Sequence, residues 1–367
     1  MQVLGLKVGE LVEVRGEAEI LATLDARGEL DGLPFMPEML AFCGRRLTVD
    51  KLAVKLCDTI NWSGIYRMRD AVHLRWVRCD GQAHGGCQAG CLVYWKEAWL
   101  RRVGPAGQAP PDGAPGSPPV ATRATLAAAT GPDAGRYACQ ATELLRAAPE
   151  RVPAWDPRQY LLDVRSGNSG ALATLGSVCV GVFNELQDAS RRFLPASLRI
   201  RGGRRYPFIN GRLHKTPQQI LGLQPGELVR VKSRQEIFAT LDVRNRNRGM
   251  TFDAEMLRYC GRQARVLRRV ERIIDERSGQ LLELPNPCIV LEGVTCTAAY
   301  HRQCPRAIYP YWREIWLERV PAPAVAPVNA SRTGSQRGEA PSDLTSGRSS
   351  RARTWRASAR RRRRSRR

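Results

Sequence analysis

Alternating hydrophobic and polar residues predict that most of the folded chain is β-structure. Residues 9–15 alternate apolar and polar side chains, and residues 226–232 show the same pattern, which is typical of half-buried strands. Residues 264–276 predict one long bent strand or two shorter ones, ending at a turn over 276–279, and residues 288–296 predict another strand. The dominant period is therefore that of strands.

Shorter stretches break this period. Residues 236–242 and 252–261 predict a short helical or turn-rich crossover between strands. Residues 311–320 fit either a strand or a helix, because Trp312 and Trp316 share a face at both periods. Four to five strands in such a unit are typical of a small SH3-like barrel.

The same pattern occurs twice. Residues 4–103 align with 221–320 at an offset of 217 without a gap, and 37 of the 100 paired residues are identical. An internal duplication separates residues that the shared fold needs from those that one copy acquired. We therefore predict a mainly β fold with some α, in which two SH3-like small β-barrel repeats are joined by a helical connector.

Composition divides the chain further. Residues 104–134 are rich in Pro, Gly and Ala, whereas 135–220 contain the apolar and aromatic residues expected of helix with loop. We expect five parts: a first repeat over 1–103, a flexible linker over 104–134, a helical connector over 135–220, a second repeat over 221–320, and a disordered, Arg-rich tail over 321–367.

Charge is concentrated at the end of the chain. The net charge is +23, and residues 351–367 hold ten arginines and no acid. Such a tail could neutralise phosphates and bind nucleic acid independently of sequence, and its candidate contacts are Arg360, Arg361, Arg362, Arg363 and Arg364. Arginine outnumbers lysine 52 to 6, which indicates high-GC coding bias, so a merely solvated extension is the alternative.

Targeting and membrane signals are weak. The first repeat begins at Leu4 and soon includes Glu10 and Glu13, so no apolar leader is expected. Residues 171–183 are too short to span a bilayer, which needs about 20 apolar residues. We expect a cytoplasmic protein whose eleven cysteines are thiols or metal ligands. Residues 171–186, followed by arginines, could lie on a membrane surface, but a buried helix between the barrels is the favoured interpretation.

Cysteine and histidine residues supply the candidate chemistry. Four such positions are kept in both copies: Cys43/Cys260, Cys79/Cys296, His84/His301 and Cys87/Cys304. Three cysteines and one histidine form a common zinc ligand set. Residues 78–91 are rich in glycine, which permits the tight turns that bring ligands together.

A second ligand set competes in the first copy. An all-cysteine site could form from Cys57, Cys79, Cys87 and Cys91. The second copy would have lost this site, because it has Ile274 and Ile308 at the positions of Cys57 and Cys91. Cys43 and Cys260 would then be small buried hydrophobes. A thiol nucleophile paired with His84 and an iron–sulfur role are weaker alternatives.

Retained acids and tryptophans have simpler interpretations. Asp25 and Asp242 follow ATL and predict turn or cap acceptors. Glu97 alternates with tryptophans as a solvent-facing strand residue would. The tryptophans at 95, 99, 312 and 316 predict core packing over an exposed aromatic platform. Catalysis by the acids Glu38/Glu255 and Glu97/Glu314 is disfavoured.

The motifs at 33–46, 79–100, 155–168 and 291–320 resemble those of a bacterial protein group without an assigned activity. The resemblance covers both repeats and the middle segment, and implies an intact bacterial protein but no reaction. We expect a non-enzymatic binding or scaffold protein, stabilised by zinc, with nucleic acid or another protein as partner. A zinc- or thiol-dependent enzyme using the first copy's cysteines is the alternative, followed by a peripheral membrane protein.

Overall fold

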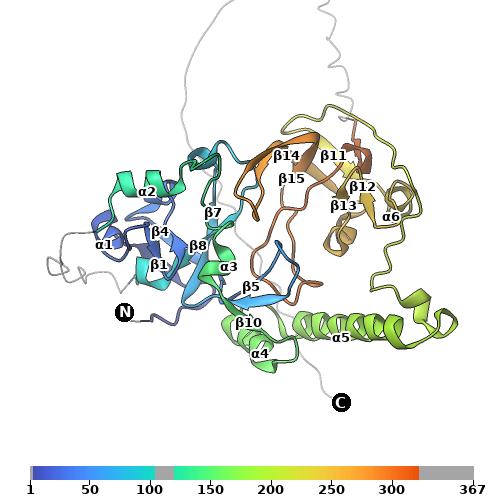
Figure 1. Cartoon of the computed structure of the whole chain (residues 1–367), viewed down its shortest axis with the longest axis horizontal. Helices are drawn as coiled ribbons and strands as arrows, with labels where there is room; N and C mark the ends of the chain where they lie inside the picture. The colour runs from blue at the N-terminus through green and yellow to red at the C-terminus, as the bar shows by residue number, and fades with distance from the viewer. Residues whose placement is uncertain (1–2, 104–119, 322–367) are drawn as a thin grey trace, which may run out of the picture. The chain divides into compact units, whose positions relative to one another are not determined.

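The computed structural model describes residues 3–103 and 120–321 (Figure 1). The described residues up to Pro321 belong to one compact unit. It is a mixed α/β structure with two antiparallel sheets that curl into half-barrels, so the expectation of two β-rich parts with some helix is confirmed at this level. The tail arginines Arg360–Arg364 lie outside the described residues.

The first segment, residues 4–103, contains a five-stranded sheet in the order β8-β7-β4-β1-β9. Its strands are β1 (Leu11–Val14), β4 (Arg46–Leu52), β7 (Ala71–Arg78), β8 (Leu92–Lys96) and β9 (Leu100–Arg102). Smaller elements are α1 (Glu17–Leu21), β2 (Glu29–Leu30), β3 (Leu33–Pro34), η1 (Pro37–Phe42), β5 (Lys55–Cys57), β6 (Ile65–Arg67), η2 (Gln82–His84) and η3 (Glu97–Trp99).

The second segment, residues 221–320, contains a four-stranded sheet in the order β15-β14-β11-β16. Its elements are β11 (Leu228–Val231), α6 (Arg234–Phe238), β12 (Arg246–Asn247), β13 (Met250–Thr251), η6 (Ala254–Tyr259), β14 (Gln263–Ile274), β15 (Leu281–Leu291), η7 (Glu314–Trp316) and β16 (Leu317–Arg319). The strand predicted over 288–296 ends at Leu291, so Cys296 lies in a loop.

Elements of the two segments coincide at the sequence offset. Leu11 pairs with Thr48 between β1 and β4, and Leu228 pairs with Arg265, which is the same register 217 residues later, between β11 and β14. The crossover helices also match, and α6 begins with a capping box in which Ser233 and Glu236 satisfy each other's backbone amides.

Tryptophans fill both cores, as predicted. Trp95 and Trp99 are fully buried and meet the edge of Phe35, whose ring centroid is 5.1 Å from that of Trp99. Trp316 lies in the same way 5.3 Å from Phe252 and is also fully buried. Edge-to-face contacts of this kind add to the stabilisation from buried area. The alternative of an exposed aromatic platform at these positions is wrong.

The two glutamates at the start of η3 and η7 differ from the prediction. Glu97 is buried, and its carboxylate accepts the backbone amides of Leu4, Gly5 and Leu6 at 2.6, 2.9 and 3.2 Å. Glu314 does the same for the strand-leading loop of the second segment. The solvent-facing assignment of Glu97 is wrong because the strand turns into a 3₁₀ helix at this residue, which directs the side chain inward. Asp25, in contrast, is the predicted turn acceptor for two backbone amides.

The predicted flexible linker 104–134 is corrected in its second half. Residues 123–130 form α2 (Arg123–Thr130), which Thr122 caps through the amide of Thr125. Leu126 of this helix is buried in the core of the first segment. Few apolar residues are enough here because the core of the first segment supplies the rest of the contact surface.

The middle segment, residues 135–220, combines helices with loops and one short strand. It contains α3 (Leu144–Ala147), β10 (Glu150–Val152), α4 (Pro157–Ser166), α5 (Ala171–Phe193), η4 (Ala196–Leu198) and η5 (Ile200–Gly203). It is also joined to the first segment, because β10 pairs with β6 in the three-stranded sheet β10-β6-β5. The buried ion pair of Lys55 with Asp163 connects α4 to β5.

Helix α5 corrects the expectation of a buried connector. Its buried residues are polar, namely Thr174, Ser177 and Gln187, whereas large apolar residues such as Leu172 and Phe193 are exposed. Figure 1 shows it as the longest helix of the chain. Among the helices of residues 3–103 and 120–321, none has the length and hydropathy needed to cross a bilayer.

Candidate metal centres

Two loops of the same length carry most of the predicted ligands. We call residues 79–91 the first knuckle and residues 296–308 the second knuckle. The first leaves β7 and returns to β8, and its ends are joined by the amide of Cys79 and the carbonyl of Cys91 at 2.9 Å. Gly81 has a φ of +75°, and a Cβ there would lie 1.9 Å from the carbonyl oxygen of Cys87. The tight turn therefore requires glycine, as expected.

In the first segment, three side chains converge beside this knuckle. The Cys79 thiol donates to Oε1 of Glu38 at 3.1 Å and lies 3.9 Å from Nδ1 of His84. Glu38 Oε1 is 3.6 Å from the same ring nitrogen. The three ligand atoms all lie within 4.8 Å of one another, so one divalent ion could contact a thiolate, an imidazole and a carboxylate here. We call these residues the first cluster.

Burial governs the protonation of the first cluster. Burial, together with the Glu38 carboxylate, raises the pKa of Cys79 far above that of an ordinary thiol. Burial lowers the pKa of His84, so its ring is neutral despite the nearby carboxylates. Oε2 of Glu38 is buried and has no hydrogen-bond partner among the described residues. A bound cation would offset the cost of burying such a carboxylate and would favour the thiolate.

The second segment repeats this arrangement with Glu255, Cys296 and His301, each 217 residues after its counterpart. Their ligand atoms also lie within 4.8 Å of one another, and we call them the second cluster. Glu255 is better satisfied than Glu38, because its carboxylate accepts the amide and hydroxyl of Thr297 and the amide of Tyr300. This carboxylate therefore already holds the knuckle in place.

His301 has an additional partner. Its Nε2 lies 3.2 Å from Oδ1 of Asp253, and the first segment has Met36 at that position. Burial opposes protonation of His301, but the hydrogen bond and charge of Asp253 outweigh it and raise the pKa to about 9. Burial and the Glu255 carboxylate raise the pKa of Cys296 well above its usual value. The two clusters thus share donors but differ in their surroundings.

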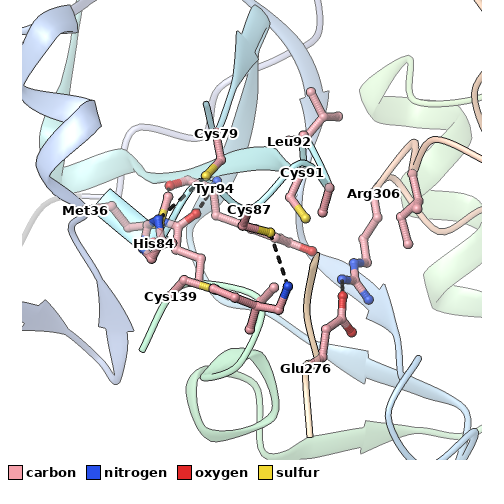
Figure 2. A pocket seen from close by; sticks show the side chains of 16 residues that line it. Met36, Cys79, His84, Cys87, Cys91, Leu92, Tyr94, Cys139, Glu276 and Arg306 are labelled. Atoms are coloured by element: carbon pink, nitrogen blue, oxygen red, sulfur yellow. Dashed lines mark hydrogen bonds and ion pairs between the residues drawn. The ribbon is translucent and has the colours of Figure 1, made fainter. Parts of the chain in front are cut away.

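Other predicted ligands line a small cavity next to the first cluster. Cys87 and Cys91 border it together with Cys79 and His84, and its volume is about 50 Å³, enough for an ion or a water molecule. In Figure 2, Cys87 and Cys91 lie between His84 and the ion pair of Arg306 with Glu276. Cys139 of the middle segment also borders the cavity, and sequence spacing gave no indication of it.

Cys43 and Cys260 lie apart from the clusters. Each caps the C-terminal end of a 3₁₀ helix, η1 or η6, and packs against its core. Burial raises the pKa of both thiols. Their surroundings are those of small buried hydrophobes, so the set of Cys43, Cys79, His84 and Cys87 is not gathered in one place.

Cys57 points to the other segment. It ends β5, and its backbone amide donates to Sγ of Cys304 in the second knuckle at 3.1 Å. The reciprocal contact joins the amide of Ile274, which has the position of Cys57, to Sγ of Cys87 at 3.3 Å. Cys57 is therefore separated from the first knuckle, with which the all-cysteine set had grouped it.

This exchange is part of an isologous contact between the segments. Thr59 hydrogen-bonds Glu276, its own counterpart at the 217-residue offset. Arg78 donates to the carbonyls of Gly90 and Ala307, at 2.8 and 3.0 Å, and these two residues are also counterparts. A local two-fold axis therefore passes between the knuckles.

A larger cleft of about 450 Å³ opens beside the second cluster. Its lining comes from the first segment, the middle segment and the second knuckle, and includes Cys57, Trp62, Arg205, Cys296 and His301. Most of the Trp62 side chain is exposed. The cleft therefore brings an aromatic ring and arginine side chains next to a candidate metal centre.

Sequence reasoning identified the thiols and imidazoles of both clusters but missed the carboxylates. Glu38 and Glu255 were recognised only as acids retained in both copies. That retention was the available signal, since a carboxylate at the N-terminal end of η1 or η6 could have been tested as a ligand. Comparison with known proteins adds no further assignment: no family model, curated protein or solved structure matches the chain.

Proposed function

We propose that the protein is a non-enzymatic binding protein built from two copies of an SH3-like unit, each stabilised by a zinc ion. One observation carries the proposal: a Glu–Cys–His cluster recurs at the same three positions of both segments. The chance convergence of three potential ligands once is common, but the same convergence after divergence of most other residues indicates a shared requirement.

The donor set favours zinc. Thiolate and imidazole nitrogen are its preferred protein ligands, and carboxylate oxygen is accepted as well. His84 is buried, Cys79 and Glu38 are close to it, and the adjoining cavity of about 50 Å³ has room for an ion or a water molecule but not for a larger substrate. This closed arrangement supports a structural role over a catalytic one.

The sequence placed the enzyme alternative at the first copy's cysteines. An open cleft, however, lies beside the second cluster, where Cys296, His301 and Asp253 border it. A thiol nucleophile needs a lowered pKa. The pKa of Cys296 is raised by its burial and by the Glu255 carboxylate, and the Asp253–His301 contact favours imidazolium over the neutral base. These surroundings disfavour a thiol nucleophile at the second cluster.

Nucleic acid is the partner that we propose. The cleft beside the second cluster is bordered by the exposed Trp62 and by three arginines. These are Arg151, Arg205 and Arg302, and they lie alongside the acids Asp58, Glu185, Asp253 and Glu255. Arginines can neutralise phosphates, and an exposed indole can stack on a base. The net charge of +23 acts in the same direction. Binding would be independent of sequence and would weaken with salt.

Zinc analysis of the purified full-length chain, prepared under reducing conditions, tests the proposal. We expect two equivalents of zinc per chain, one lost on Cys79→Ser and one on Cys296→Ser. Cys260→Ser is the matched control and should keep both, because Cys260 packs against the core away from the cluster. Wild-type protein that binds no zinc would overturn the proposed function.

Titration with a fluorescent single-stranded oligonucleotide at several salt concentrations tests the partner. We expect the affinity to fall steeply with salt, and to fall further on Trp62→Ala and on removal of residues 351–367. Trp76→Ala is the control, because Trp76 is also exposed but does not border the cleft. Equal binding by wild type and the Trp62 variant would exclude the cleft as the binding site.

A further inference from the structure

The zinc sites belong to the pair of segments and not to either segment alone. We propose that Cys57 of the first segment completes the second site, with Cys296, His301 and Cys304 as the other ligands, while Cys79, His84, Cys87 and Cys91 serve the first. This inference rests on the zinc binding proposed above. It replaces both ligand sets that the sequence suggested. It also places the carboxylates of Glu38 and Glu255 beside the ligands Cys79 and Cys296 instead of on the metal.

The contact of Cys57 with the second knuckle carries this assignment. The Cys57 amide donates to Sγ of Cys304, and Cys57 also borders the same cleft as Cys296 and His301. Three of the four proposed ligands thus face one cleft, and the fourth is in hydrogen-bond contact with Cys57.

The pattern of losses between the segments agrees with the assignment. Each site has five candidate ligand positions: four in its own knuckle, and one from the other segment, which is Cys57 or its counterpart Ile274. In the first site the position from the other segment is Ile274, which contacts Cys87 but cannot bind metal. The second site has lost the last knuckle position, which is Ile308. Each site retains three thiols and one imidazole, which is a full zinc set.

The second knuckle holds an unfavourable backbone. Ala298, Arg302, Gln303 and Ala307 have φ values of +58°, +52°, +59° and +40°, at positions where the first segment has glycine. Left-handed conformations cost a non-glycine residue on the order of 1 kcal/mol. The hydrogen bonds of Glu255 to Thr297 and Tyr300 hold this loop without the glycines that would ease it, and a bound metal would add to them.

The surroundings also suit the charge of such a site. Zinc with three thiolates and one imidazole has a net charge of −1. The buried Arg306 guanidinium lies beside it, donating to the Cys57 carbonyl at 3.2 Å and to Thr59 at 2.7 Å. Arg306 also pairs with Glu276 at 2.9 Å, which fixes its orientation. The hydrogen bond of Arg306 to the Cys57 carbonyl would hold this proposed ligand residue in position beside the metal.

Zinc content of full-length double variants tests the assignment directly. Cys57→Ser should leave one zinc. Cys57→Ser with Cys296→Ser should also leave one, because both changes remove the same site, whereas Cys57→Ser with Cys79→Ser should leave none. Cys57→Asp supplies an alternative ligand and should restore the second zinc. Cys43→Ser is the control and should keep two.

The assignment of Cys57 to the second site would be wrong if the double variant lacking Cys57 and Cys79 kept one zinc and the double variant lacking Cys57 and Cys296 kept none. Two zinc ions in Cys57→Ser with unchanged affinity would also overturn it, and would leave the proposed function intact. Wild-type protein without zinc would instead contradict the proposed function itself. Near-ultraviolet circular dichroism of the buried tryptophans checks that each variant is folded.

An independent observation concerns α5. Its exposed residues include a stripe with alternating spacings of three and four, the seam of a two-stranded coiled coil. The stripe consists of Leu172, Leu175, Cys179, Val182, Leu186, Ala189 and Phe193, all exposed. Leu172 is 86% and Phe193 77% exposed. We infer that α5 pairs with α5 of a second copy of the chain.

Length and composition favour a second copy as the occupant. The stripe runs from Leu172 to Phe193, which is nearly the whole length of α5, so an equivalent stripe on a second α5 could cover it from end to end. The chain outside the described residues cannot match it, because residues 104–119 have no large apolar side chain and 322–367 have only Val325, Val328, Leu344 and Trp355. The charges of α5, two acidic and two basic, sum to zero and do not oppose self-association.

Sedimentation equilibrium of the full-length chain tests this pairing. We expect a dimer at micromolar concentrations, converted to monomer by Leu175→Glu with Leu186→Glu. Ala173→Glu, exposed on the same helix but off the stripe, should remain dimeric. A monomeric wild type, or a dimer unaffected by the double variant, would overturn the inference. Flotation of wild type with anionic vesicles, lost in the double variant, would assign the stripe to a membrane surface instead.

Discussion

Replacing Glu314 by glutamine should destabilise the second segment although the side chain keeps its size. Oε2 of Glu314 accepts the amides of Leu221 and Gly222 at 2.5 and 3.1 Å, and Oε1 accepts that of Leu223 at 3.0 Å. Oε1 also accepts from Arg269 at 2.7 Å. A glutamine oxygen could keep the first pair of amides, but its NH₂ group would then face two donors.

The expected loss follows from these contacts. One hydrogen bond to a charged group contributes about 1.5–3 kcal/mol, and the partly exposed pair with Arg269 about 0.5–1 kcal/mol. We therefore expect Glu314→Gln to lower the free energy of unfolding by about 2–4 kcal/mol. Glu97→Gln should cost less, because Leu52 has the position of Arg269 in the first segment.

The stability of the protein at acid pH should also depend on the Glu314 carboxylate. Burial opposes ionisation of Glu314, but the three backbone amides and Arg269 outweigh it and lower the pKa. A lowered folded-state pKa means that this stabilisation is present above the ordinary value of 4.5 and is lost as the pH falls through the folded-state pKa. Glu314→Gln should therefore flatten the acid side of the stability profile.

Urea unfolding followed by tryptophan fluorescence measures the loss, and hydrogen exchange of the 221–223 amides measures it locally. Glu318→Gln is the control, because its pair with Arg230 is exposed and should contribute less than about 1 kcal/mol. The reasoning fails if Glu314→Gln costs no more than Glu318→Gln and these amides exchange at the wild-type rate.

Three further predictions concern buried charge and metal. Lys55→Met should lower the free energy of unfolding by about 3–5 kcal/mol, because it leaves Asp163 buried without its partner. The double variant Lys55→Met with Asp163→Leu should recover most of this loss. If urea unfolding shows the same loss in the single and the double variant, the prediction is wrong. In metal-free protein the raised His301 pKa adds stability that is complete below pH 6.5 and is lost as the pH rises through about 9. Melting temperatures from neutral to alkaline pH should show this decline, and a profile unchanged by Asp253→Asn would exclude the pair as its cause. Protein with free zinc 1,000-fold above Kd should be more stable than chelator-treated protein by about 4 kcal/mol per site. Calorimetric melting temperatures that do not differ between the two samples would count against structural zinc.

The fold was predictable where local pattern and packing agree. Strand alternation located β1 and β11, and the tryptophans near each C-terminal strand were expected in the core, where Trp99 and Trp316 lie. Glu97 was misassigned because alternation assumes a continuing strand, whereas the backbone turns at that residue. The apolar stripe of α5 was also misread, since helical periodicity identifies an apolar face but not what covers it.

The candidate site was predictable only within each segment. Cys79 and His84 are five residues apart, so their spacing already indicated a shared ligand role. Cys57 and Cys304 are 247 residues apart, and only the packing of one segment on the other brings them together. Glu38 and Glu255 were missed because carboxylates are common on protein surfaces, and nothing in the spacing separates a ligand from a solvated acid.

Ile274 and Ile308 have a consequence for how the chain evolved. In a homodimer of identical subunits, any substitution at a ligand position would appear in both sites at once. A fused chain carries two independent versions of each position, so the isoleucines could arise in different sites and cost each only one of its donors. A single chain therefore lets its two halves diverge separately, as at Asp253 beside His301, where the first segment has Met36.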